Sequence, residues 1–211
     1  MPRKVLIVDY GMGNVKSVSN ALTAAGCLPL VSADPRDVVL ADGFVLPGVG
    51  AFGEAIRNLR ANGMADALTH EVMTRRKPIL GICLGMQLLG NESEEGGRHA
   101  GLGWIEARVR ALPAEPGLRV PHMGWNDIHV RTKEPLFAGA DDAPTYYFAH
   151  SYVIECSPDL VSATFQYGGE QVGALQQHHI FGTQFHPERS ADAGLALFRR
   201  FAQRIEAPHV D

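Results

Sequence analysis

The sequence of 211 residues has few cysteines and no familiar metal-binding pattern. Its three cysteines, Cys27, Cys83 and Cys156, form an odd and sparse set, which argues against a disulfide framework and favours a reducing compartment. No CxxC pair and no HExxH motif occurs, so we expect neither a structural nor a catalytic metal. We therefore expect a cytoplasmic protein.

The sequence also lacks a basic excess and a long apolar run. Its net charge of −4 leaves no surplus of positive charge for nucleic acid. The run Val5–Val8 ends at Asp9 and is too short for the core of a signal peptide or for a membrane span. With 45% apolar and 20% charged residues, the composition is that of an ordinary globular protein, and the length fits one domain, 1–211.

The first half of the chain alternates strand and helix patterns. Asn14 is a plausible cap for a first helix and Gly26 a plausible stop. Such alternation implies a parallel sheet with right-handed crossovers. We expect strands at 4–9, 28–32, 43–46 and 78–82, and helices at 14–25, at 54–76 with a break near 62–63, and from 84 to 89.

The second half is richer in strand patterns. We expect His178 and His179 to form an exposed turn there. The fold class that follows is α/β: a single domain with a central, mixed, mostly parallel sheet flanked by helices. The expected strands are 104–111, 127–130, 145–148, 153–155, 161–167 and 180–185, with a closing helix at 191–205.

Cys83 lies in a pattern typical of a nucleophile. The segment Gly81-Ile-Cys-Leu-Gly85 joins a strand to a helix, the spacing known for the nucleophile elbow of serine hydrolases. Its two glycines suit a turn in which backbones approach too closely for a Cβ. The turn would hold Cys83 in strained geometry, and the start of the helix would favour its thiolate.

A base and an oxyanion site can also be proposed. His186 and Glu188 are two apart at a strand end, so on an extended backbone they point the same way, and Pro187 favours that backbone at His186. Glu188 can then orient the imidazole toward a thiol. The oxyanion donors we expect are the N–H groups of Leu84 and of Val49, which lies between two glycines.

The motifs together resemble those of the triad-type glutamine amidotransferases, which have a flavodoxin-like α/β fold. The resemblance rests first on Gly81-Ile-Cys-Leu-Gly-Met-Gln87 and Phe185-His-Pro-Glu188. Four more segments are similar to the glutaminase subunits of imidazole glycerol phosphate synthase, and the match runs from about 5 to 205. They are Asp9-Tyr-Gly-Met-Gly-Asn14, Leu46-Pro-Gly-Val-Gly-Ala-Phe52, Val120-Pro-His-Met-Gly-Trp-Asn126 and Phe148-Ala-His-Ser-Tyr152.

This resemblance implies a cofactor-free reaction and a partner. Cys83 would attack the carboxamide of glutamine, His186 would protonate the released ammonia, and water would hydrolyse the thioester. A separate (β/α)₈ cyclase subunit would use the ammonia to make imidazole glycerol phosphate and aminoimidazole carboxamide ribotide in histidine biosynthesis. No nucleic acid or membrane enters this scheme.

The resemblance also assigns residues by motif position. Arg189 departs from the family, which usually has lysine there, so one interface contact changes its shape. The residues expected to hold glutamine are Gly50, Gln87, Glu95, His150, Ser151 and Tyr152, and those expected at the cyclase are Asn14, Trp125, Tyr147 and Arg189.

Three alternatives and one regulatory hypothesis remain. The chain could serve another synthase, such as that of anthranilate or pyridoxal phosphate, although the Gly-Trp-Asn segment argues against it. A dinucleotide-binding module is disfavoured because Lys16 replaces the third glycine after Gly11 and Gly13. A silent subunit is disfavoured by the complete triad. The regulatory hypothesis is that docking of the cyclase turns the Val49 peptide, so that the isolated subunit is nearly idle.

Overall fold

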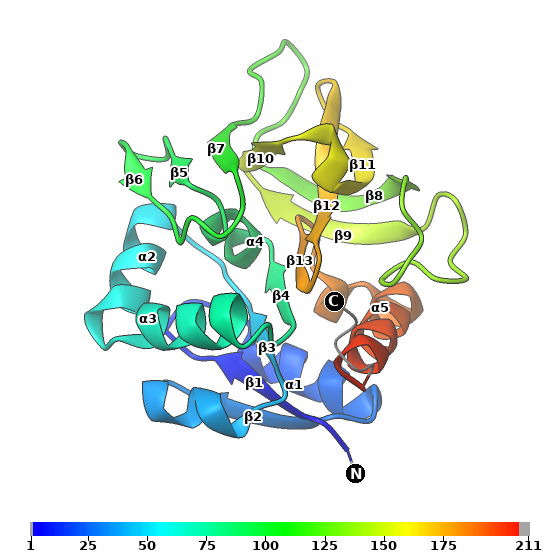
Figure 1. Ribbon diagram of the computed structural model, residues 1–211. Coiled ribbons are helices and arrows are strands. Elements are labelled where there is room, and N and C mark those ends of the chain that lie inside the picture. The colour runs from blue at the N-terminus through cyan, green and yellow to red at the C-terminus, as the bar shows by residue number, and fades with distance from the viewer. Residues whose placement is uncertain (1, 207–211) are drawn as a thin grey trace.

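Nine strands form a large sheet in the order β2-β1-β3-β4-β13-β12-β11-β8-β9. The computed structural model describes residues 2–206, so the outermost residues of the expected 1–211 domain lie outside the described part. Figure 1 shows this sheet running through the molecule. In spatial order its strands are β2 (Leu28–Ser32), β1 (Lys4–Val8), β3 (Gly43–Leu46), β4 (Ile79–Ile82), β13 (Ile180–Thr183), β12 (Glu170–Gln177), β11 (Val161–Gln166), β8 (His122–Val130) and β9 (Thr145–His150).

The direction of pairing changes at β13. From β2 to β13 all neighbours are parallel, whereas from β13 to β9 all are antiparallel. The prediction of a mixed sheet is confirmed. Its pairings divide equally between the two types, however, so "mostly parallel" describes only the first half. A second, four-stranded sheet contains β10 (Tyr152–Cys156), β7 (Ala107–Ala111), β5 (Glu92–Ser93) and β6 (His99–Ala100).

Helices cover both faces of the parallel half. On one side lie α2 (Phe52–Ala61) and α3 (Met64–Thr69), which continues into the π-helical turn η2 (His70–Thr74). On the other side lie α1 (Val15–Ala24) and α5 (Ala191–Glu206), as Figure 1 shows. The remaining elements are α4 (Leu84–Leu88) and the short 3₁₀ turns η1 (Pro35–Leu40), η3 (Pro158–Leu160) and η4 (Pro187–Arg189).

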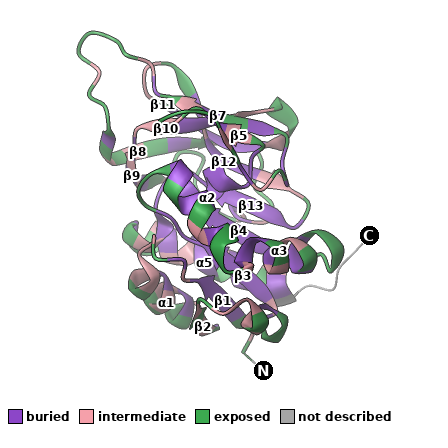
Figure 2. Cartoon of the chain, turned by 90° about the vertical axis from the view of Figure 1, so that its left-hand side faces the viewer, coloured by how far each residue is buried: buried purple, intermediate pink, exposed green. Residues whose placement is uncertain are grey.

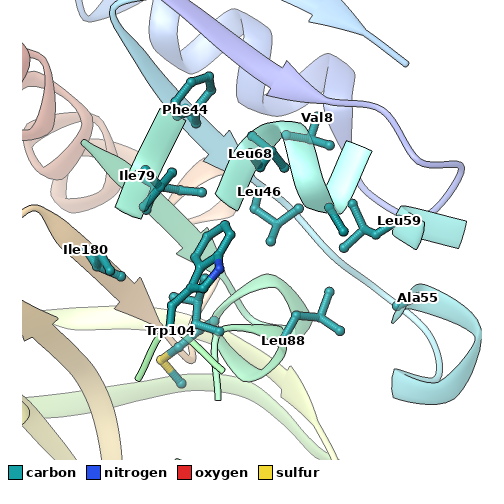
Figure 3. Packing of buried hydrophobic residues seen from close by; sticks show 14 of the residues in the cluster. Val8, Phe44, Leu46, Ala55, Leu59, Leu68, Ile79, Leu88, Trp104 and Ile180 are labelled. Carbon is teal, nitrogen blue, oxygen red and sulfur yellow. The ribbon is translucent and has the colours of Figure 1, made fainter. Parts of the chain in front are cut away.

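Alternation along the strands divides the core into two clusters. Leu6 and Val8 of β1 pack with α2 and α3, whereas Val5 and Ile7 pack with α1 and α5. This is the period of two expected when a parallel strand is buried on both faces. Figure 2 shows β3, β4 and β13 as buried between helices with exposed outer surfaces. Figure 3 shows the first cluster, in which Trp104 packs with residues of β3, β4 and β13.

Predictions for the first half are confirmed closely, with one error. The strands at 28–32 and 43–46 have the predicted bounds, and the long helix breaks at 62–63. Gly26 follows α1 with φ +88°, which confirms it as a stop. Asn14 occupies the N-cap position, but its side chain makes no capping hydrogen bond, so the predicted cap was wrong.

Predictions for the second half needed more correction. The strand expected at 104 begins at 107 and the one expected at 127 begins at 122. The short strands β5 and β6 were missed, as was β12, which Gly173 interrupts and polar residues flank. The exposed turn was wrong for His179, because its side chain is buried and its Nε2 lies 2.7 Å from the Val72 carbonyl oxygen.

Candidate active site

The nucleophile elbow has the predicted strain. Cys83 separates β4 from α4 with φ 53° and ψ −110°, a conformation that costs a residue with a Cβ free energy. A Cβ on Gly85 would lie 1.8 Å from the Leu46 carbonyl oxygen, and one on Gly81 would lie 2.8 Å from the Gly85 oxygen. The sequence therefore needs glycine at both positions, which confirms the reason given for them.

The histidine and its carboxylate form a buried pair beside this elbow. His186 Nδ1 lies 2.9 Å from Glu188 Oε1, and both side chains are almost fully buried. The backbone is extended at His186, but Glu188 lies in the 3₁₀ turn η4. The expected contact therefore forms through a turn, and the predicted extended backbone at Glu188 was wrong.

The electrostatics of this pair favour the imidazolium. Burial by itself lowers the pKa of His186. The charge and hydrogen bond of the Cys83 side chain, and those of Glu188, outweigh burial and raise the pKa to about 10. Since β4 and β13 are parallel neighbours, their carboxyl ends meet, and this brings Cys83 to His186. The geometry suits a thiolate–imidazolium pair.

A cavity of about 210 Å³ opens beside Cys83. It is smaller than pockets for drug-sized ligands, which start near about 300 Å³, and so suits a small metabolite. All eight predicted oxyanion and glutamine-binding residues line it. The complete lining is Val49, Gly50, Cys83, Leu84, Gln87, Glu95, Pro121, Met123, Ala149, His150, Ser151 and Tyr152.

Two of the lining side chains are partly engaged with the protein. Gln87 Nε2 donates to the Tyr152 carbonyl oxygen at 2.9 Å and to Gln184 Oε1 at 3.2 Å. Glu95 Oε2 accepts from the Phe52 N–H at 2.9 Å, at the start of α2. The amide oxygen of Gln87 and the second oxygen of Glu95 are thus the atoms these residues offer to a ligand.

His150 belongs to a chain of hydrogen bonds whose directions are fixed. Its Nδ1 lies 3.0 Å from the Tyr152 carbonyl oxygen, which can only accept, so Nδ1 carries the hydrogen. Its Nε2, 3.0 Å from His122 Nδ1, therefore accepts. Asn126 Nδ2 donates to His122 Nε2 at 3.4 Å and to the Gln166 carbonyl oxygen at 3.1 Å, which completes a consistent set of neutral tautomers.

Burial keeps both of these rings uncharged. It lowers the pKa of His122 to about 4. For His150, burial is again the largest cause, with His122 adding to it, and the pKa falls to about 3. Both nitrogens of His150 are used within the protein, so this side chain contributes the wall of its ring to the cavity rather than a donor.

Tyr10 packs against the loop around Val49, which carries one of the expected oxyanion donors. Its hydroxyl donates to the Pro47 carbonyl oxygen at 2.7 Å. A Cβ on Gly48 would lie 2.6 Å from that hydroxyl oxygen, and Gly50 has φ +104°. Val49, between the two glycines, is 46% exposed. Sequence reasoning missed Tyr10, although it lies inside a motif singled out for the resemblance.

An exposed aromatic group lies beside the site. Trp125 of β8, 56% exposed, is directly opposite Tyr147 of β9, and their rings meet edge to face. The Arg189 guanidinium lies 4.2 Å from the centre of the Tyr147 ring, a cation–π arrangement. The structure thus brings together three of the four predicted interface residues. Asn14 precedes α1, and a Cβ on its neighbour Gly13 would lie 2.9 Å from Pro47 Cγ.

Hydrogen bonds connect this aromatic group to His186. The His186 N–H donates to the Tyr147 carbonyl oxygen at 2.8 Å. The Ser190 hydroxyl donates to the His186 carbonyl oxygen at 2.6 Å and accepts from the Tyr147 N–H at 3.0 Å. Ser190 was missed because a serine after a strand end gives no distinctive signal.

A second hollow, of about 530 Å³, lies over the small sheet and is lined by Glu155 and Cys156. Its chemistry differs from that beside Cys83, because Glu155 pairs with Arg108 and burial raises the pKa of Cys156 to about 11. Within residues 2–206, no cluster of three or more histidine, cysteine, aspartate or glutamate side chains could hold a metal ion. Over the same residues, no helix has the length and apolar character needed to cross a membrane.

Comparisons with known proteins show the family of the chain. The family description "Glutamine amidotransferase class-I" matches residues 6–204. The chain is 44% identical over 197 residues to "Imidazole glycerol phosphate synthase subunit HisH 1" of Campylobacter jejuni, covering 93% of this chain and 98% of the relative. It is 45% identical over 203 residues to the HisH subunit of Methanothermobacter thermautotrophicus, covering 96% of this chain and 100% of the relative.

Solved structures support the fold. PurLQS from Thermotoga maritima superimposes with a TM-score of 0.76 at 19% identity, covering 97% of this chain and 99% of that chain. The glutaminase domain of Trypanosoma brucei CTPS superimposes with a TM-score of 0.60 at 17% identity, covering 96% and 94%. The chain therefore belongs to the class-I glutamine amidotransferases, among the relatives named as HisH subunits of imidazole glycerol phosphate synthase.

Proposed function

We propose that this chain hydrolyses glutamine to glutamate and ammonia and delivers the ammonia to the cyclase subunit of imidazole glycerol phosphate synthase. The observation that carries this proposal is the Cys83–His186–Glu188 arrangement, with Cys83 lining a small cavity. The relatives' names supply the identity of the synthase and its place in histidine biosynthesis. The odd, sparse cysteine set supports a cytoplasmic location.

The chemistry follows from the charges at the site. The Cys83 thiolate attacks the carboxamide carbon, and the N–H groups of Val49 and Leu84 stabilise the oxyanion. His186, held in orientation by Glu188, gives its proton to the leaving ammonia as the C–N bond breaks. Water then attacks the thioester with His186 as base, and the C–S bond breaks to return the thiolate.

The aromatic group supplies a surface for the partner. Trp125 and Met123 are strongly exposed apolar side chains next to the cavity. Exposed aromatic and methionine side chains beside an arginine are the composition expected at the core of an interface. Asn14, Trp125, Tyr147 and Arg189 therefore form the proposed contact with the cyclase, in a heterodimer.

The loop at Val49 is the proposed regulatory element. Gly48 and Gly50 flank the Val49 peptide, and its side chain is exposed beside the cavity. Docking of a liganded cyclase would turn this peptide so that its N–H points to the oxyanion. Losing one such donor costs about 10²–10³-fold in rate in a hydrolase, which is enough to account for much of the activation.

The test compares glutamine hydrolysis by the isolated chain, by its complex with the cyclase, and by the complex with a cyclase ligand. We expect the slowest release of glutamate from the isolated chain and the fastest from the liganded complex. Equal rates in all three would contradict the loop switch. Failure of the complex to form imidazole glycerol phosphate from glutamine, when it does so from ammonium salt, would contradict the proposed function.

A further inference from the structure

A chain of hydrogen bonds runs from the Tyr152 carbonyl oxygen through Gln87 and Gln184 to the sulfur of Cys83. Gln184 lies directly after β13, is fully buried, and places its Nε2 3.7 Å from Cys83 Sγ. Its backbone N–H donates to the Gly173 carbonyl oxygen at 2.8 Å, which fixes the residue against β12. A fully buried amide is expected to have each polar atom paired, and here one of the partners is the nucleophile.

The orientation of the Gln184 amide follows from its neighbours. Gln87 donates one hydrogen of Nε2 to the Tyr152 carbonyl oxygen, which has no hydrogen to give. The second contact of the same nitrogen is to Gln184, so the Gln184 atom there must be the oxygen. The nitrogen of Gln184 is left to face the sulfur, and it arrives there as a donor.

We propose that Gln184 is a positioning residue of the glutaminase reaction, whose amide N–H donates to the sulfur of Cys83 and holds it as a thiolate. The inference rests on the proposed function for its role in turnover, but not for its effect on the sulfur. Hydrogen bonds to a charged acceptor are stronger than those to a neutral one, so this donor stabilises the thiolate more than the thiol. The Ala149 carbonyl oxygen, 3.8 Å from Sγ, accepts a hydrogen bond from the thiol. This contact favours the thiol and so acts against the effect of Gln184.

Gln184 can donate a hydrogen bond to the sulfur throughout the reaction, which His186 cannot do. The imidazolium gives up its proton to the leaving ammonia, whereas the amide keeps its hydrogen throughout. When the C–S bond of the thioester breaks, the sulfur leaves with the electron pair and again accepts from Gln184. Both the attacking and the leaving thiolate are therefore stabilised by a donor that does not titrate.

Other titratable groups also face the sulfur or line the cavity beside it. They are His186 with Glu188 after β13, Tyr10 after β1, and His150 and Glu95 at the cavity. Burial raises the pKa of Tyr10, and burial first, then His122, lower that of His150 to about 3, so both stay neutral at neutral pH. His186 is coupled to the sulfur, since the charge of Cys83 helps to raise its pKa, so the alkylation profile reports on the Cys83–His186 pair.

The experiment measures alkylation of the isolated chain by iodoacetamide as a function of pH, with each cysteine followed by peptide mass spectrometry. In Gln184→Met, which keeps the side chain's length, we expect alkylation of Cys83 to slow by about tenfold at pH values below the half-maximal point of the profile. The pH of half-maximal rate should rise by about one unit, which is the same effect. Alkylation of half-buried Cys156 should not change and serves as the internal reference.

Gln171→Met is the matched control. Gln171 is a buried glutamine of the neighbouring strand β12, and its amide bonds to the carbonyl oxygens of Tyr167 and Gly168 instead of to Cys83. The same loss of a buried amide should leave the Cys83 profile unchanged. In the cyclase complex, Gln184→Met should lower kcat by about 10- to 100-fold, the range for one hydrogen bond to a charged group, with KM changed by less than about threefold.

Two further measurements test the proposal if Gln184→Met fails to fold. Gln184→Glu is isosteric, removes the donor and adds a negative charge, so its Cys83 profile should move further in the same direction. In the unaltered protein, the side-chain amide signal of Gln184 in a ¹⁵N correlation spectrum should titrate with the alkylation profile of Cys83. The proposal would be overturned by an unchanged Cys83 alkylation profile in a folded Gln184 variant. It would also be overturned if the amide signal of Gln184 did not change over the pH range in which Cys83 alkylation changes.

These outcomes are separate from those of the proposed function. Alkylation needs neither glutamine nor a cyclase, so a shifted profile stands even if the unaltered complex released no ammonia from glutamine. Conversely, an active complex with an unshifted Gln184→Met profile would leave the glutaminase assignment in place and remove only the role of Gln184.

Discussion

The two halves of the large sheet have different tasks. The parallel half, from β2 to β13, is covered by helices on both faces and holds Cys83 and His186 at adjacent strand ends. The antiparallel half, from β12 to β9, presents Trp125 to solvent and holds the neutral His122–His150 pair. The comparison teaches that the proposed reacting groups come from the parallel half, while the antiparallel half completes the cavity wall with His150 and Ala149 and presents the exposed Trp125.

Removing the nucleophile gives the largest expected effect, and it affects only the function that we assign to the parallel half. Cys83→Ala should abolish glutamine hydrolysis; loss of the nucleophile in a serine protease costs on the order of 10⁶ in kcat. The core is unchanged, so the chain should still fold and bind the cyclase. Cyclisation with ammonium salt at high pH should persist, which controls for assembly. A folded Cys83→Ala chain with normal glutaminase activity would refute the triad.

Removing the carboxylate partner should cost less. Glu188→Gln keeps the shape of the side chain but weakens the hold on His186, and we expect a loss of at most about 10⁴-fold, as for the aspartate of a serine protease. The pH dependence of glutamine hydrolysis should also change, in a direction that follows from the His186 pKa. A raised His186 pKa, about 10, means that the imidazolium persists until the pH rises through that value. Without Glu188 the pKa falls, so the alkaline decline in activity should begin at lower pH.

Removing the exposed aromatic group tests the antiparallel half. Trp125→Ala should weaken binding of the cyclase by at least about 30-fold, the effect of a typical interface hot spot, measured by titration calorimetry. Alkylation of Cys83 in the isolated chain should be unchanged, because Trp125 does not line the cavity. If the alkylation profile moved while affinity did not, the division of tasks between the halves would be wrong.

The smallest effect concerns acid stability of the antiparallel half. In an unfolded chain His122 has an ordinary pKa near 6.5, whereas in the fold burial lowers it to about 4. Stability is thus complete above about pH 6.5 and declines as the pH falls toward 4, by up to about 1.4 kcal/mol per pH unit for each proton taken up.

His122→Phe should make that decline less steep, because it removes one of the buried imidazoles whose pKa is lowered in the fold. Phenylalanine suits the position because the His122 ring stacks with Phe148, Phe165 and Tyr167. Urea unfolding at pH 7 and pH 5 would measure it, with Phe181→Leu, a core variant in the parallel half, expected to shift both values equally. An equally steep decline in His122→Phe would show that other groups set the acid sensitivity.

The same two halves differ in how well sequence predicted them. Buried parallel strands such as β3 are continuous apolar runs between glycines and loops, so their bounds were clear. The elbow at Cys83 was predictable because its glycines are required by local steric limits. The strand β8 was cut short because Gly124, with φ +135°, breaks its alternation, and only pairing with β9 shows that the strand begins at His122.

Residues that act through distant partners were not predictable. Gln184 contacts Cys83 across 101 positions of sequence, and Tyr10 reaches Pro47 across 37. Neither residue carries a local pattern that indicates such a contact. His150 was assigned to the site by motif position, but only the structure shows that both of its ring nitrogens are engaged with the protein.

The most direct test of the central claim is to trap the covalent intermediate. The liganded complex is supplied with glutamine, quenched with acid during turnover, and digested for peptide mass spectrometry. We predict a glutamyl group on the peptide that contains Cys83, and none on the peptides of Cys27 or Cys156. Turnover with a glutamyl group on another cysteine, or turnover that continues in Cys83→Ala, would contradict it.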